Sequence, residues 1–142
     1  DSSNKITGTL KLYEWLQDSK NKDLDEIRKC LGRMLFSGTE QEKEVGSLSG
    51  GEKHRLMLSK LMLQRANLLI LDEPNNHLDL EAIIALGEAL YNFSGSCICV
   101  SHDRELIDAF ANRILHLKGN GEIIDFKGSY EEYRTTYAMD EK

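Results

Sequence analysis

Residues 68–74 read LLILDEP, so that four aliphatic residues run directly into two carboxylates and the only proline of the chain. A short aliphatic run of this kind predicts a strand buried on both faces in a parallel sheet. Asp72 and Glu73 then lie at its carboxyl end, the edge at which open α/β sheets bind ligands. Because neighbouring strand residues point opposite ways, the two acids can take separate tasks. Asp72 is a candidate to hold magnesium through water, and Glu73 to orient or deprotonate an attacking water.

Upstream, residues 48–52 read LSGGE and stand directly before an apolar-periodic run at 50–64 that predicts a helix. Two adjacent glycines, Gly50 and Gly51, let a ligand approach the backbone closely, and Ser49 offers a hydroxyl. The helix start adds free N–H groups and a positive dipole end, which suit a phosphate. Ser-Gly-Gly alone is better explained as a helix cap. The complete five-residue string is far more specific. Because it occurs shortly before Asp72 and Glu73, an ordinary charged turn becomes the weaker explanation of those two acids.

Downstream, residues 75–80 read NNHLDL and predict a polar turn that starts a helix at 80–91. Asp79 is a natural N-cap for that helix, and capping alone explains its presence. His77 by itself is more typical of a loop or packing residue than of a catalyst. A functional role for either residue therefore depends on the neighbouring segments.

A second apolar strand is predicted at residues 97–100, and Ser101, His102 and Asp103 follow it. At the carboxyl edge of a sheet, His102 is placed to reach a terminal phosphate and to act as a hydrogen-bonding switch. Three consecutive residues cannot form a Ser-His-Asp hydrolase triad, because that constellation is assembled from distant positions.

The remaining patterns predict helices around this centre. Two short helices are expected within residues 9–36, with Asp23 and Glu26 as an acidic capping pair and Gly38 at the stop. A polar loop should fill residues 39–47. A further short helix is predicted at 104–111. The alternation of strands with helices predicts a parallel sheet.

A hairpin is predicted after that helix. Its strands are residues 113–117 and 122–126, joined by the turn Gly119-Asn120-Gly121, and a last helix follows Ser129.

Composition limits the function further. The 142 residues suit one domain, the net charge of -6 argues against a general basic groove for nucleic acid, and no apolar run is long enough to span a membrane. Cys30, Cys97 and Cys99 lack disulfide or zinc spacing and are expected as buried free thiols in a reducing cytosol. His54 and His116 show no ligand spacing and are interpreted as surface or core residues.

Taken in order, LSGGE, LLILDEP, NNHLDL and SHD resemble the signature, Walker B, D-loop and H-loop of ABC ATPases. The NHLD turn and the segment GSYEEY at 128–133 are similar to the translation-associated ABC-F group, which usually has threonine where this chain has Asn75. Residues 32–36, GRMLF, look like the second nucleotide-binding domain of such a tandem protein. The resemblance implies an α/β fold: an incomplete P-loop NTPase domain of ABC type, with a helical subdomain at 1–63, a partial ATPase core at 64–142, and a C-terminal hairpin plus helix.

The resemblance also implies site roles. In that family two nucleotide-binding domains enclose two ATP molecules, and each site takes its signature from the opposite domain. Ser49, Gly50 and Gly51 would touch the terminal phosphate of ATP held by the partner domain. Asp72 would serve Mg²⁺, Glu73 the hydrolytic water, and His102 the terminal phosphate. Asp79 would communicate across the dimer.

No glycine of the chain is followed by lysine, so the phosphate-binding pattern G-x-x-x-x-G-K-[ST] does not occur. We expect a piece of a longer protein that binds ATP weakly and hydrolyses it negligibly in isolation. The longer protein is expected to be a cytoplasmic ATPase that acts on the ribosome and its RNA in translation, without inserting into the membrane. Two alternatives stay open: a subunit of an ABC transporter, and a non-enzymatic interaction module. An apolar sheet edge and core surface should be left exposed, and self-association or modest stability is expected as the result.

Overall fold

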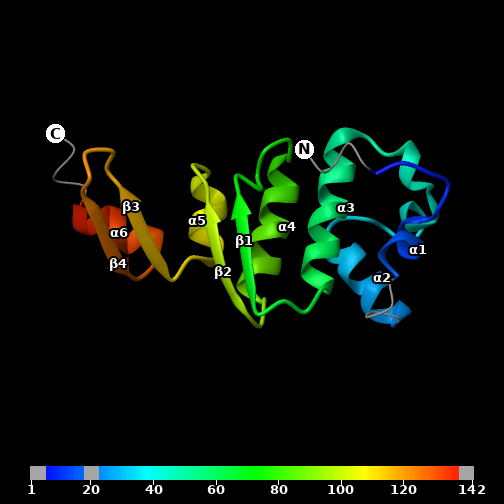
Figure 1. Ribbon diagram of the computed structural model, residues 1–142, viewed down its shortest axis with the longest axis horizontal. Coiled ribbons are helices and arrows are strands. Elements are labelled where there is room, and N and C mark those ends of the chain that lie inside the picture. Colours follow the sequence, from blue (N-terminus) through cyan, green and yellow to red (C-terminus); the bar gives the residue numbers. More distant parts are fainter. Residues whose placement is uncertain (1–5, 18–22, 138–142) are drawn as a thin grey trace.

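The computed structural model describes residues 6–17 and 23–137. The molecule is elongated, with helices at its N-terminal end, a two-stranded parallel sheet in the middle and a hairpin with a helix at the other end (Figure 1). The elements are α1 (Leu12–Leu16), α2 (Leu24–Arg33), η2 (Glu40–Glu42), η3 (Val45–Ser47), α3 (Gly50–Leu63), β1 (Leu68–Asp72), α4 (Leu80–Tyr91), β2 (Ser96–Val100), α5 (Arg104–Phe110), β3 (Arg113–Leu117), β4 (Ile123–Lys127) and α6 (Tyr130–Tyr137).

These bounds confirm the predicted order of helices and strands, with α4 matching to the residue. Two short 3-10 helices, η2 and η3, occupy the stretch predicted as a plain loop. Asp23 caps α2 as expected, because its carboxylate accepts from the N–H groups of Asp25 and Glu26.

The end of α2 was wrongly predicted. The helix ends at Arg33, well before Gly38, and Leu35 takes the left-handed conformation with φ of 69°. The N–H of Phe36 donates to the carbonyl of Leu31 at 2.9 Å, and that of Leu35 to Gly32 at 3.1 Å, which together form a Schellman ending with leucine in the position that glycine usually takes. The Arg55 guanidinium of α3 donates to the carbonyls of Met34 and Leu35, so a tertiary contact stabilises this ending.

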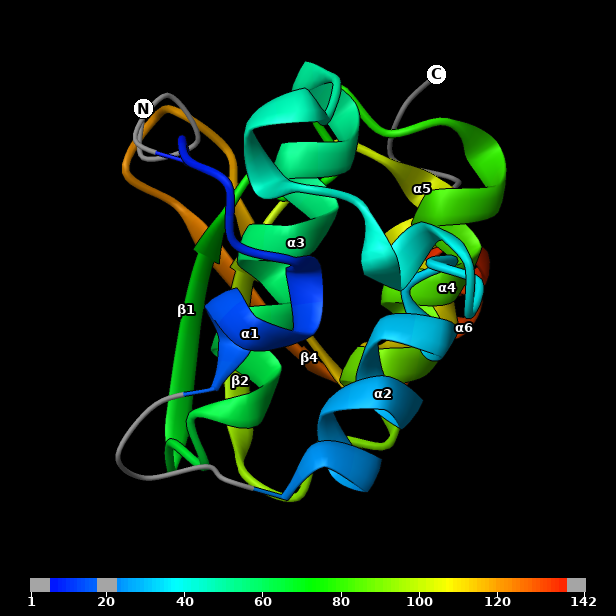
Figure 2. The ribbon, with the colours of Figure 1, turned by 90° about the vertical axis from the view of Figure 1, so that its right-hand side faces the viewer.

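The predicted parallel pairing is confirmed: β1 lies beside β2, with Ile70 opposite Ile98. The prediction that β1 is buried on both faces is wrong. Figure 2 shows α3 and α4 on the same side of this sheet, and only Leu69 and Leu71 of the strand point into that packing. The other face is open, and its apolar residues, called here the bare sheet face, are Leu68, Ile70, Ile98 and Val100. Ile70 is 71% exposed, so the expected apolar exposure is confirmed.

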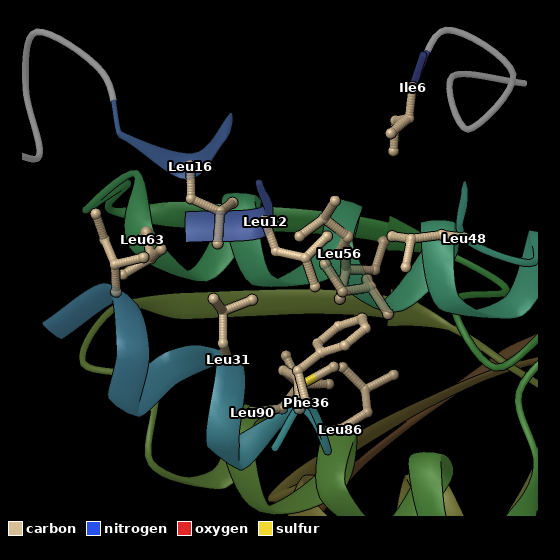
Figure 3. Packing of buried hydrophobic residues seen from close by; sticks show 14 of the residues in the cluster. Ile6, Leu12, Leu16, Leu31, Phe36, Leu48, Leu56, Leu63, Leu86 and Leu90 are labelled. Carbon is tan, nitrogen blue, oxygen red and sulfur yellow. The ribbon is translucent and has the colours of Figure 1, made fainter. Parts of the chain in front are cut away.

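Leucine-rich faces of α1, α2, α3 and α4 meet in one core, where side chains converge around Phe36 (Figure 3). Phe36, Leu31, Leu56 and Leu86 are fully buried. Large buried side chains of this kind each stabilise a fold by about 1.5–3 kcal/mol. This core includes residues from both sides of position 63. The division of the chain into a helical subdomain at 1–63 and an ATPase core at 64–142 stays a prediction.

The predicted hairpin forms, but its connection is longer than an Asn-Gly turn. Leu117 pairs with Ile123, which leaves residues 118–122 as the loop. Gly119 and Gly121 both have positive φ, 83° and 89°, and Asn120 accepts from the N–H of Glu122 at 3.0 Å. In the ranges described, no helix has both the length and the apolar character that crossing a bilayer requires.

Candidate functional site

The two predicted acids lie at the carboxyl end of β1, as expected. Asp72 is the last strand residue and is exposed. Glu73 has already left the strand, because its φ is 46°, a left-handed value that costs a non-glycine residue free energy. Its N–H donates to the carbonyl of Val100 at 2.7 Å, which holds the turn against the end of β2. The strand therefore ends at Asp72 and the backbone turns at Glu73, so strand alternation does not extend to the second acid.

Glu73 and His102 meet across this edge. Nδ1 of His102 lies 2.5 Å from Oε1 of Glu73, although the residues are 29 positions apart. Since a carboxylate only accepts, the imidazole donates from Nδ1. The side chain of His102 is 92% exposed, so Nε2 is left to face a ligand.

The start of α3 has the predicted form. Ser49 is the N-cap: its hydroxyl oxygen accepts from the N–H of Glu52, and the Glu52 carboxylate accepts from the N–H of Ser49, both at 3.2 Å. Ser49 and Gly50 are exposed, so an anion has access to the helix N-terminus. Partial burial acts to raise the pKa of Glu52, but the bonds from Ser49 and the nearby Lys43 outweigh it and hold that pKa below its usual range. Part of the positive end of the helix is therefore already neutralised by the ionised Glu52.

The turn between β1 and α4 is tied to its surroundings. Asp79 caps α4, because its carboxylate accepts from the N–H of Ala82 at 2.9 Å. His77 is exposed and has φ of 65°. Asn75 accepts a hydrogen bond of 2.8 Å from the Ser101 hydroxyl, which joins this turn to the loop that carries His102.

Two contacts of α3 with the same turn were missed by the sequence analysis. Nε2 of His54 donates to the carbonyl oxygen of Pro74 at 2.7 Å. A Cβ built on Gly51 would lie 3.0 Å from the carbonyl oxygen of His77, so the two backbones pass close together. No local sequence pattern predicts either contact. In each, a residue of α3 meets a backbone carbonyl that lies more than nineteen positions away and is brought close only by tertiary packing.

Thus one sheet edge carries Asp72, Glu73 and His102. The start of α3, with Ser49 and Gly50, adjoins the turn that follows β1. Asp72 fits a magnesium ion, because Mg²⁺ takes one or two carboxylates and keeps several waters, and this carboxylate is exposed. Within the described residues, no three His, Cys, Asp or Glu side chains gather as a protein ligand cage for a metal.

Comparison with known proteins places these features in a family. The family model described as ABC transporter matches residues 2–76. The Uncharacterized ABC transporter ATP-binding protein YkpA of Bacillus subtilis is 49% identical over 136 residues, covering 94% of this chain and 25% of YkpA. The Energy-dependent translational throttle protein EttA of Escherichia coli K12 is 45% identical over 106 residues, covering 75% of this chain and 19% of EttA. The chain therefore spans a quarter or less of these relatives.

A solved structure agrees. One chain of the complex of archaeal ribosomal stalk protein aP1 and archaeal ribosome recycling factor aABCE1 matches with a TM-score of 0.64 at 26% identity, covering 95% of this chain and 28% of that chain. The sequence match and the mixed α/β structure lead to the same conclusion: the chain belongs to the ABC transporter family and comprises part of an ABC nucleotide-binding domain.

Proposed function

We propose that this chain is part of an ABC-F ATPase that acts on the ribosome in translation, in the cytoplasm. The ABC family match supports ATP as the ligand. EttA is named as a translational throttle protein, and the archaeal factor is named for ribosome recycling. The NHLD turn after the carboxylates adds the ABC-F resemblance.

One observation carries the catalytic part of the proposal: the carboxylate of Glu73 and the imidazole of His102 meet at 2.5 Å beside Asp72. Glu73 is the group to orient or deprotonate water, since the N–H of His102 fixes one of its oxygens and leaves the other to accept. His102 is then the group that faces the terminal phosphate. Both residues come from loops at the carboxyl edge of one sheet, which is where this type of fold binds ligands.

The other half of the site is assigned to the helix start. Ser49, Gly50 and Gly51 would serve ATP held by a second nucleotide-binding domain, and Asp79 would communicate with that domain. The chain would depend on a phosphate-binding loop supplied outside its own sequence, since it has no G-x-x-x-x-G-K-[ST] pattern. Asp72 would hold Mg²⁺, which would neutralise negative charge on the phosphates when bound.

The test uses the protein expressed at its full encoded length. Glu73→Gln should abolish multiple-turnover ATP hydrolysis and trap the protein on ribosomes in ATP, as seen by co-sedimentation through a sucrose cushion. Glu88→Gln makes the same change on an exposed position of α4 and should behave as the parent protein. Hydrolysis retained in Glu73→Gln would refute the catalytic assignment. Hydrolysis lost without ATP-dependent ribosome binding would refute the ribosomal one.

A subunit of an ABC transporter is the second candidate, favoured by the family description and by the name of YkpA. It predicts that ATPase activity changes on adding membrane vesicles that hold a partner subunit, and not on adding ribosomes.

A further inference from the structure

Helix α3 contacts the turn that carries Glu73 at two points. His54, one turn into that helix, donates from Nε2 to the carbonyl oxygen of Pro74 at 2.7 Å. Gly51 passes so close to the His77 carbonyl that even a methyl group would press on it at 3.0 Å. The helix that Ser49 caps therefore contacts this turn at two places, Pro74 and His77.

The His54 bond acts on a backbone with little freedom. The ring of Pro74 fixes its φ near −65°, so a bond to the Pro74 carbonyl constrains the whole residue. Pro74 is buried, and a buried carbonyl needs a hydrogen-bond partner. Glu73 directly before it has a left-handed φ of 46°, a conformation that persists only where the surroundings fix it. Its N–H is held on the other side by Val100.

We propose that His54 is a positioning residue for ATP hydrolysis: by holding the Pro74 carbonyl it keeps the Glu73 carboxylate against His102. The inference rests on the proposed function, since it requires Glu73 to act on water. Under that assignment α3 and Glu73 of one chain serve two different ATP molecules. The bond from His54 therefore connects phosphate binding at the Ser49 end of α3 to the carboxylate that acts at the other site.

A matched pair of substitutions tests this in the protein at its full encoded length. His54→Gln keeps an N–H donor at about the reach of Nε2, whereas His54→Met has a similar length and no donor. Both residues are good helix formers, so α3 should be retained. We expect His54→Met to lower kcat about three- to tenfold with a KM for ATP within twofold of the parent, as loss of one hydrogen bond allows. His54→Gln should recover most of that kcat.

Three results would overturn the proposal: an unchanged kcat in His54→Met, an equal loss in His54→Gln, or a loss confined to KM. A loss of kcat that parallels a loss of helical circular dichroism at the assay temperature would also refute it, because the bond would then support folding alone. The Glu73→Gln variant distinguishes a failure of the His54 proposal from a failure of the proposed function. If that variant is inactive while His54→Met is fully active, only the role of His54 fails; if Glu73→Gln hydrolyses ATP normally, the proposed function itself fails.

Discussion

The hydroxyl of Ser101 donates to Oδ1 of Asn75 at 2.8 Å and accepts from the N–H of Asp103 at 3.0 Å. One side chain thus joins the loop after β2, which carries His102, to the turn after β1, which carries Glu73. The His102–Glu73 bond joins the same two segments, and the backbone bond from Glu73 to Val100 ties the turn to the end of β2. The geometry of the candidate site therefore depends on contacts that lie beside the catalytic groups.

Asn75 should be replaceable by threonine and not by valine. Threonine keeps an oxygen that can accept from Ser101, and valine has nearly the same shape without it. Because both residues are half-buried, leaving the Ser101 hydroxyl without this partner should make Asn75→Val about 1 kcal/mol less stable than Asn75→Thr. Urea unfolding monitored by circular dichroism measures the difference. Equal stabilities would mean that the bond contributes nothing.

The adjacent glycines of α3 should respond differently to alanine. A Cβ on Gly50 meets nothing within 4 Å, so Gly50→Ala should raise the melting temperature, because alanine favours the helix by up to about 1 kcal/mol. In Gly51→Ala the contact at 3.0 Å with the His77 carbonyl should cancel that gain or reverse it. Thermal melts of both variants compare them directly. A rise of equal size in Gly51→Ala would show that the turn does not press on the helix.

The three thiols should be poorly reactive in the folded chain. Burial raises the pKa of Cys30 to about 11, and burial together with the charges of Cys97, Glu73 and Asp72 raises that of Cys99 to about 12. At pH 8 a thiol with a pKa of about 11 is roughly one part in 10³ thiolate, and one with a pKa of about 12 roughly one part in 10⁴. The thiolate is the species that reacts.

Alkylation by iodoacetamide, followed by mass spectrometry, should therefore be far slower in the native chain than in guanidinium. Since the folded pKa values are raised, the stability that the neutral thiols contribute is full below the unfolded pKa of about 8.5 and declines as the pH rises towards 11 or 12. The three thiols are half-buried and not fully buried as predicted, and native labelling of Cys99 at the denatured rate would contradict even this partial protection.

The bare sheet face should promote self-association of the 142-residue chain. Ile70 is 71% exposed at its centre, and Ile70→Thr should shift sedimentation profiles towards the monomer while leaving the core intact. Leu80→Thr is the control, since Leu80 is 60% exposed on α4 and outside that face. A chain that already sediments as a monomer, or an equal effect of both substitutions, would remove this role from the sheet.

Much of the architecture could be predicted because its signals are local. Asp79 and Ser49 cap the helices they were expected to cap, and the aliphatic runs form the expected parallel strands. The ending of α2 could not be predicted, because Leu35 takes a left-handed conformation that Arg55 stabilises from another helix. The open face of β1 was missed for a related reason: an aliphatic run records that a strand is apolar, and not how many of its faces are covered.

The sequence by itself determined which groups stand at the ends of the two strands, since strand and helix periodicity and capping chemistry are properties of neighbouring residues. Only the tertiary structure decided how those groups meet. It brings Nδ1 of His102 to Glu73, turns Glu73 into a left-handed backbone, and sets His54 against the Pro74 carbonyl. The physical reason is that each of these contacts requires the packing of one element on another, and hydrogen-bond partners separated by twenty residues or more leave no periodic trace in the chain.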